Sequence, residues 1–143
     1  MSEGKYVKQS YQFNASVADV WDALINPEKT RQYMFGCDPV TGWIPGEALD
    51  WVGAEDGITY VKGKLVQFDP PFIFSMTTYD PSAPIQDDYH VVGEYKLSHE
   101  NGITTMEISQ GDFSKVTNGD ERFEEAKKSW KSAMEVFRKV VES

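Results

Sequence analysis

The first patterned segment of the chain, residues 6–15, alternates apolar and polar side chains. One side carries Val7, Tyr11, Phe13 and Ala15, and the other carries Lys8, Ser10, Gln12 and Asn14. A period of two with one polar face is typical of an antiparallel strand that packs on a core and leaves its other face in water. The pattern therefore predicts a strand over residues 6–15.

Residues 16–25 change to a helical period. Ser16 suits an N-cap because Asp19 follows three residues later, as in a capping box. The apolar side chains that then recur at helical spacing are Val17, Val20, Trp21 and Leu24. A short helix with its Trp facing inward is expected here.

A second short helix is predicted directly after the first. Asn26 can cap it, and Pro27 suits its first turn, where a missing N–H costs nothing. We expect Tyr33 and Met34 on its inward side, and we expect the helix to end by Gly36.

The next part of the chain, as far as residue 113, reads as strands and turns. Asp56-Gly57 and Asn101-Gly102 are hairpin signals, and Gly63 marks a bulge or bend inside a longer strand. Six successive strands are predicted, around Trp43-Ile44 and over 48–52, 58–68, 72–79, 89–98 and 103–113.

The last segment, from about Asp120 to Glu142, has the clearest helical pattern. Its apolar residues fall within an arc of roughly 120°. They are Phe123, Ala126, Trp130, Ala133, Met134, Phe137, Val140 and Val141. A long amphipathic helix must bury this stripe, and the sheet is the only large surface that the pattern offers.

The order of these elements predicts an α+β fold in one domain, residues 1–143. A meander of antiparallel strands twists and curls, so a curved sheet of about seven strands would wrap on the C-terminal helix. The two short helices after the first strand would close one end of the curl. The space at the other end is filled by large side chains or left as a cavity.

Aromatic residues make up 13% of the chain. Two interpretations stand: large core residues of a sheet-rich protein, or the walls of an apolar ligand cavity. The candidate cavity residues lie on the predicted strands, on the second short helix and on the long helix. They are Tyr33, Trp43, Trp51, Phe74, Met76, Tyr95, Met106, Trp130, Met134 and Phe137.

The net charge of −9 arises entirely in the first 109 residues. Such a field repels phosphate backbones and anionic lipid surfaces, so neither nucleic acid nor a membrane is expected as a partner. The single cysteine, Cys37, permits no intrachain disulfide, and neither a signal-peptide pattern nor a long apolar run occurs. We expect a cytoplasmic protein.

Candidate catalytic groups are sparse. His90 follows Asp87 and Asp88, a set that could ligate a metal or move a proton, but His90 falls on the polar side of its strand. His99 lies beside a hairpin turn, and nothing near Cys37 in the sequence would lower the pKa of its thiol.

Three carboxylates, Glu47, Asp50 and Glu94, lie on or beside predicted strands, and the sequence does not tell which way they point. Phosphate-loop, nucleophile-elbow and zinc patterns are absent. We assign no catalytic residue, no metal and no cofactor.

Three stretches carry a resemblance that covers nearly the whole chain: "ASVADVWDALINPEKTRQY", "KGKLVQFDPPFIFSMT" and "SWKSAMEVF". With the element order, they resemble the helix-grip (SRPBCC) superfamily of birch-pollen-allergen-like and START-like domains. Within it, the chain resembles the branch of activator of heat-shock protein 90 ATPase homologues. "GWIPGEALDW" departs from the branch, since many members have a paired-glycine turn there.

The resemblance implies three functions. The first is binding of a small hydrophobic or aromatic ligand between the sheet and the C-terminal helix. The alternative is a cochaperone-like interaction with a chaperone, and the third is a cyclase-type enzyme, which would need a carboxylate or His in the cavity. A monomer and a homodimer are both compatible with it.

Overall fold

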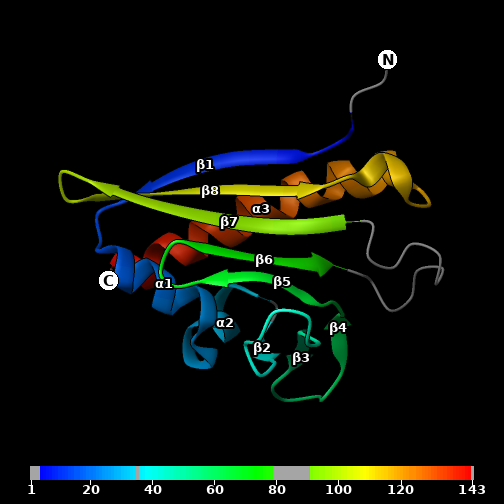
Figure 1. The fold of residues 1–143 in the computed structure, drawn as a ribbon, viewed down its shortest axis with the longest axis horizontal. Helices are drawn as coiled ribbons and strands as arrows, with labels where there is room; N and C mark the ends of the chain where they lie inside the picture. The colour runs from blue at the N-terminus through cyan, green and yellow to red at the C-terminus, as the bar shows by residue number, and fades with distance from the viewer. Residues whose placement is uncertain (1–3, 35, 79–90, 143) are drawn as a thin grey trace.

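The computed structural model describes residues 4–34, 36–78 and 91–142, and the order of its elements is the predicted one (Figure 1). A first strand precedes two short helices, further strands follow, and a long helix ends the chain. The elements are β1 (Val7–Phe13), α1 (Val17–Ile25), α2 (Pro27–Tyr33), β2 (Cys37–Val40), β3 (Asp50–Gly53), β4 (Thr59–Val61), β5 (Leu65–Asp69), β6 (Ile73–Thr78), β7 (Val91–Glu100), β8 (Ile103–Gly111), the 3-10 helix η2 (Phe113–Lys115) and α3 (Gly119–Glu142).

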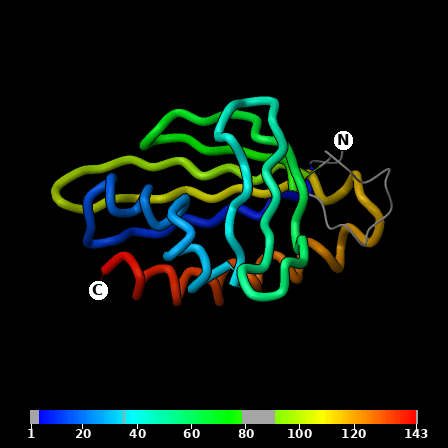
Figure 2. The backbone as a smooth tube through the Cα atoms, turned by 90° about the horizontal axis from the view of Figure 1, so that it is seen from below, coloured from blue at the N-terminus to red at the C-terminus, as the bar shows by residue number. Residues whose placement is uncertain are grey.

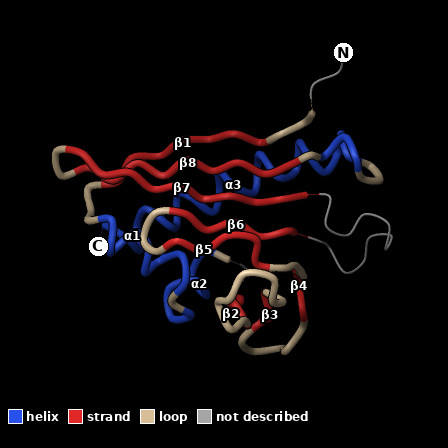
Figure 3. Tube along the Cα trace, viewed as in Figure 1, coloured by secondary structure: helices blue, strands red, loops and turns tan. Residues whose placement is uncertain are grey.

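The strands form two antiparallel sheets (Figure 3). The main sheet has five strands in the order β1-β8-β7-β6-β5, and the small sheet has three in the order β2-β3-β4. The α+β helix-grip fold is confirmed. The strand count differs, because the described residues form five plus three strands where the sequence predicted one sheet of about seven.

The division between the sheets falls at Gly63, where the sequence predicted a bulge or bend. A Cβ at this position would lie 1.8 Å from the Thr77 carbonyl oxygen, so only glycine fits so close to the β6 backbone. The segment predicted as one strand over 58–68 is therefore β4 and β5, with the chain crossing from one sheet to the other between them.

The predicted strand around Trp43 and Ile44 is wrong. The strand that follows α2 is β2, Cys37–Val40, and Trp43 lies in the loop after it with a φ of 59°. An extended strand does not include this left-handed conformation. The Trp43 ring stacks on Phe68, with centroids 5.0 Å apart, and meets Phe74 edge-on, so tertiary packing overrides the local pattern.

The helix boundaries and the main hairpin follow the predicted local signals. The Ser16 hydroxyl accepts from the Asp19 backbone N–H at 3.1 Å, and the Asn26 side chain accepts from the Glu28 N–H at 3.1 Å. Asn101 and Gly102 have φ values of 53° and 79°, as a two-residue hairpin between β7 and β8 requires.

Helix α3 runs along one face of the main sheet (Figure 2). Towards its C-terminal end, Phe137 is fully buried. Its ring centroid lies 5.3 Å from that of Phe13 and 4.9 Å from that of Tyr33. We call this region the filled core; it comprises Phe13, Tyr33, Met106, Met134 and Phe137. Among the described helices, none is long and apolar enough to cross a membrane.

Candidate functional site

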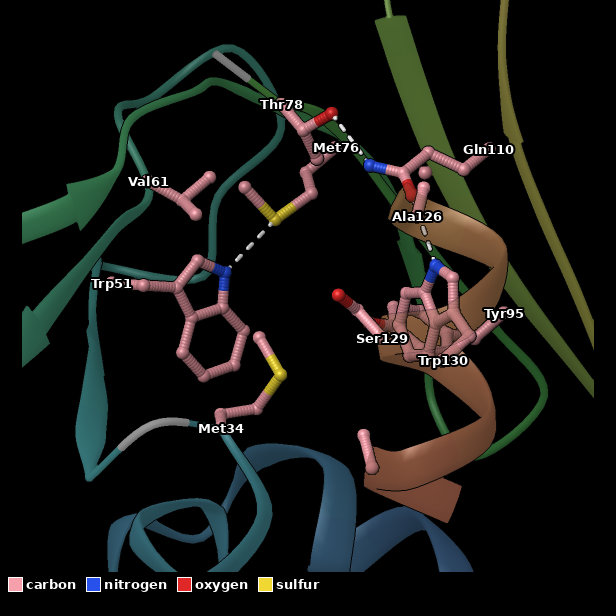
Figure 4. Close-up of a pocket in the computed structure, with 12 residues that line it drawn as sticks. Met34, Trp51, Val61, Met76, Thr78, Tyr95, Gln110, Ala126, Ser129 and Trp130 are labelled. Atoms are coloured by element: carbon pink, nitrogen blue, oxygen red, sulfur yellow. Dashed lines mark hydrogen bonds between the residues drawn. The ribbon is translucent and has the colours of Figure 1, made fainter. Parts of the chain in front are cut away.

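Under the N-terminal half of α3 the packing opens into a cavity of about 200 Å³, which we call the hollow (Figure 4). Its walls come from α3, from the main sheet, from the small sheet and from the end of α2. The lining residues are Met34, Trp51, Val61, Met76, Thr78, Gly93, Tyr95, Gln110, Ala126, Ser129, Trp130 and Ala133.

The floor of the hollow is the inward face of β6, β7 and β8. Antiparallel pairing places Gly93 opposite Met76 on one side and opposite Gln110 on the other. Tyr95 follows on the same face, two residues along the strand. A Cβ at residue 93 would meet the Thr78 methyl at 3.5 Å, an ordinary contact distance, so a side chain has room there and the glycine leaves that room empty.

The α3 wall consists mainly of small side chains. Ala126, Ser129, Trp130 and Ala133 share one face of the helix because they are three, four and seven positions apart. Only Trp130 reaches far towards the sheet, and its ring lies 5.6 Å from that of Tyr95 in an edge-on arrangement. The other three hold the helix backbone near the hollow without filling it.

The opposite wall is formed by Trp51 of β3, Val61 of β4 and Met34 at the C-terminal end of α2. The Trp51 indole N–H points to the Met76 sulfur at 3.4 Å. Trp51 and Trp130 thus face the hollow from opposite sides, as Figure 4 shows.

A chain of hydrogen bonds runs along one edge of the hollow. The Trp130 indole N–H donates to Gln110 Oε1 at 2.9 Å, and Gln110 Nε2 donates to Thr78 Oγ1 at 3.2 Å. The Thr78 hydroxyl donates in turn to the Val91 carbonyl at 3.4 Å. These bonds fix the orientation of the Gln110 amide and leave one of its two N–H groups without a partner among the described residues.

Tyr95 is the buried phenol of the site, with 8% of its surface exposed. No described residue makes a hydrogen bond with its hydroxyl, and no fully enclosed side-chain polar atom of the described residues lacks a partner. The oxygen therefore keeps some accessible surface, and the space that Tyr95 borders is the hollow. Burial raises the pKa of the Tyr95 phenol, so the group stays protonated and able to donate at neutral pH.

The hollow adjoins an outer groove of about 480 Å³ between α2 and α3. Ser129 and Ala133 border both spaces, and Lys128 and Val136 lie in the groove alone. In Figure 4 the Ser129 hydroxyl points into the hollow from this side. The side chains that separate the groove from the hollow at these two positions are therefore small.

The structure brings together Trp51, Met76, Tyr95 and Trp130 of the ten sequence candidates. Phe74 lies behind Tyr95, with ring centroids 5.3 Å apart. Trp43 packs with Trp21, Phe68 and Phe74 in an aromatic cluster at the side of the main sheet. The remaining four candidates, Tyr33, Met106, Met134 and Phe137, belong to the filled core.

Eight lining residues were not among the sequence candidates: Met34, Val61, Thr78, Gly93, Gln110, Ala126, Ser129 and Ala133. Most are small or polar, whereas the sequence candidates are large and apolar or aromatic. Gly93 interrupts the inward apolar positions of β7, and Gln110 is a polar residue at an inward position of β8. Both signals were present in the sequence.

Among the described residues, none of the twelve that line the hollow is a carboxylate or a histidine. His99 and Glu47 are exposed, while Asp50 and Glu94 lie outside the lining. Asp87, Asp88 and His90 lie outside the described residues.

Cys37 has little nucleophilic character. Its side chain is buried, and burial raises the pKa of its thiol, so the thiolate is scarce at neutral pH. In the described part of the chain, no three His, Cys, Asp or Glu side chains gather as metal ligands would.

Comparison with known proteins places this fold among relatives. The profile of the family described as "Activator of Hsp90 ATPase homolog 1-like protein" matches residues 14–142. No curated protein matches the chain significantly.

Several solved structures share the fold. ChR145 from Cytophaga hutchinsonii is 26% identical over 96% of this chain and 94% of its own, with a TM-score of 0.74. MLL2253 from Mesorhizobium loti is 16% identical over 94% of this chain and 95% of its own, with a TM-score of 0.78. A structure of the Aha1 dimer from Colwellia psychrerythraea is 10% identical over 96% of each chain, with a TM-score of 0.73.

The last two likenesses show the fold alone, whereas the family profile spans nearly the whole sequence. The chain belongs to the activator of Hsp90 ATPase homolog 1-like family, within the helix-grip superfamily.

Proposed function

We propose that residues 1–143 form one domain that binds a small hydrophobic ligand in the hollow. The observation that carries this proposal is an apolar space of about 200 Å³ beside a core that is otherwise packed. Ligand sites are mostly apolar and aromatic, with a few placed polar groups. Two indoles, one phenol and two thioethers around the hollow match that composition.

The cost of leaving this space empty also supports a binding role. Unfilled core volume destabilises a protein by about 24 cal/mol per Å³, so filling part of the hollow with larger side chains would add stability. Because Gly93 and the small residues of α3 leave the hollow unfilled, the protein lacks this additional stability. A functional site can carry such a cost in stability.

The test compares wild type with Gly93→Val, which places a branched side chain inside the hollow. Ser98→Val is the matched control, because Ser98 is an exposed residue of the same strand on its outer face. Thermal-shift and native mass-spectrometry screens with fatty acids, aromatics and isoprenoids provide the readout. Hits should bind wild type and Ser98→Val but not Gly93→Val. Equal binding to all three proteins, or no hit at all, contradicts the proposal.

A second candidate function is a cochaperone-like interaction with a chaperone. The family match favours it, since the family is described by its likeness to an activator of the Hsp90 ATPase. It predicts a complex with an Hsp90-type chaperone and a raised rate of ATP hydrolysis. Absence of a complex at low salt, where charge attraction is strongest, would rule it out.

The assembly state and the location of the chain stay predictions. The relative from Colwellia psychrerythraea is described as a dimer. For this chain, a monomer and a homodimer are both retained as predictions of the assembly state. Light scattering after gel filtration distinguishes them. A cytoplasmic location accords with a single cysteine that cannot form an intrachain disulfide.

A further inference from the structure

The polar groups at the hollow that lack a partner can all donate a hydrogen bond. The Trp51 and Trp130 N–H groups are already bonded. The groups left over are the Tyr95 hydroxyl, the Ser129 hydroxyl and one N–H of Gln110, which have no bonding partner among the described residues. Of these, the Tyr95 hydroxyl is the most enclosed, since Tyr95 is buried and Ser129 is exposed beside the outer groove.

An unpaired donor in an enclosed apolar site favours a ligand that carries an acceptor. A bound hydrocarbon would cover the Tyr95 hydroxyl and remove it from water without supplying a bond, which costs free energy. A ligand with a carbonyl or ether oxygen at that point avoids this cost. Among hydrophobic ligands of equal size, the Tyr95 hydroxyl therefore favours those that carry a hydrogen-bond acceptor.

The charges around the hollow favour a neutral ligand. Among the described residues, none of the twelve that line the hollow carries a charge, so an ionised group would lose its hydration without gaining a partner from them. Lys128 lies in the outer groove and not in the lining. The net charge of −9 further disfavours anions.

The volume sets the size of the ligand. An engineered apolar cavity of about 150 Å³ holds one benzene ring. The hollow, at about 200 Å³, has room for one ring and a short substituent. Trp51 and Trp130 lie on opposite sides of the hollow (Figure 4) and offer aromatic contacts to such a ring.

We infer that the ligand is a neutral compound of about one ring that carries a carbonyl-type acceptor, and that the Tyr95 hydroxyl donates to this acceptor. The inference rests on the proposed binding function and adds the chemical class of the ligand. Tyr95 is then the residue that sets specificity, and Gly93 is the position that sets the size limit.

The experiment uses three probes of nearly equal size: acetophenone with a carbonyl, ethylbenzene with no acceptor, and benzoate with a negative charge. Each is titrated into the ¹⁵N-labelled chain, and the amide signal of Gly93 reports occupation of the hollow. Wild type should bind acetophenone roughly threefold to tenfold more tightly than ethylbenzene, the effect of one hydrogen bond. Benzoate should bind most weakly.

Tyr95→Phe keeps the ring and removes only the hydroxyl, so it should abolish the preference for acetophenone: acetophenone loses its donor, and ethylbenzene no longer covers an unpaired hydroxyl and should bind somewhat more tightly. Tyr11→Phe is the control, because the Tyr11 hydroxyl donates to Gln9 and the residue does not line the hollow. The preference should survive in that variant.

The outcomes separate this inference from the proposed function. Equal affinities for acetophenone and ethylbenzene, a preference that persists in Tyr95→Phe, or tightest binding of benzoate each overturn the inference. The binding function still stands in those cases if Gly93→Val blocks the probes. If no probe shifts the Gly93 signal, the inference fails, and the proposed function fails as well only if the wider screen with wild type and Gly93→Val also yields no hit.

Discussion

The two halves of α3 cover different kinds of interior. Around Phe137 the aromatic rings of Phe13 and Tyr33 meet it at about van der Waals distance, and the space is filled. Around Trp130 equally large side chains surround an open volume of about 200 Å³. The two regions differ in the size of the neighbouring side chains, since the sheet contributes Gly93 and α3 contributes Ala126 and Ala133 to the walls of the hollow.

The same contrast holds for two buried tyrosines. Tyr33 in the filled core donates to the Ala23 carbonyl at 2.8 Å, which lies in the last turn of α1 and has no helical partner of its own. Tyr95 at the hollow has no such acceptor among the described residues. One hydroxyl serves the fold, and the other is the donor that we propose for the ligand.

The largest expected effect is on the filled core. Phe137→Ala should lower the free energy of unfolding by about 3–5 kcal/mol, because it opens a cavity in packed surroundings. Trp130→Ala should cost less, about 1.5–3 kcal/mol, because Trp130 is only partly buried and already borders empty space. Urea unfolding measures both. An equal or reversed order would show that the hollow is packed as tightly as the core.

High pH should act through the two buried tyrosines. Burial raises the pKa of Tyr33 and of Tyr95, so each binds its proton more tightly in the folded state than in the unfolded state. Their stabilising contribution is complete below pH 10 and is lost as the pH rises towards the folded pKa, by about 1.4 kcal/mol per pH unit for each group. Tyr95→Phe should therefore flatten the decline in stability above pH 10. A decline as steep as that of wild type contradicts the burial of this phenol.

At neutral pH the two tyrosines should differ. Tyr33→Phe should cost about 1 kcal/mol, since it leaves the buried Ala23 carbonyl without its donor. Tyr95→Phe should change the free energy of unfolding by less than about 0.5 kcal/mol, because no bond to a described residue is lost. The comparison is made by urea unfolding at pH 7, and a larger loss for Tyr95→Phe would mean that its hydroxyl is structural.

The last expected effect is a gain in stability. Gly93→Val should raise stability by about 0.5–1 kcal/mol, because it restricts the unfolded chain and suits a strand, while the hollow accepts the added methyl groups. Thermal unfolding measures the gain beside Ser98→Val. A loss of stability would mean that the space at Gly93 is too small for a side chain, and hence for a ligand.

Much of the fold could be predicted from local pattern. The caps at Ser16 and Asn26, the hairpin at Asn101 and the apolar face of α3 depend on residues a few positions apart, so the sequence shows them directly. The loop that holds Trp43 could not be predicted, because its left-handed backbone depends on contacts with Phe68 and Phe74, far along the chain.

The site was predictable only in part, for a related reason. Period and spacing indicate that Trp51, Tyr95, Trp130 and Phe137 face inward, and all of them do. They do not indicate which of these meets another side chain and which meets empty space. Gly93 and Ala126 answer that question, because their lack of a large side chain leaves the space beside the aromatic residues empty.

Local chemistry and residue pattern are enough to predict the order of the elements, the inward faces of the strands and of α3, and the family. The division of the sheet at Gly63 and the hollow between Trp51 and Trp130 depend instead on tertiary packing. Local patterns do not specify the distances between packed elements. Whether an inward side chain touches a partner depends on how far apart two elements pack, and that spacing results from all their contacts together.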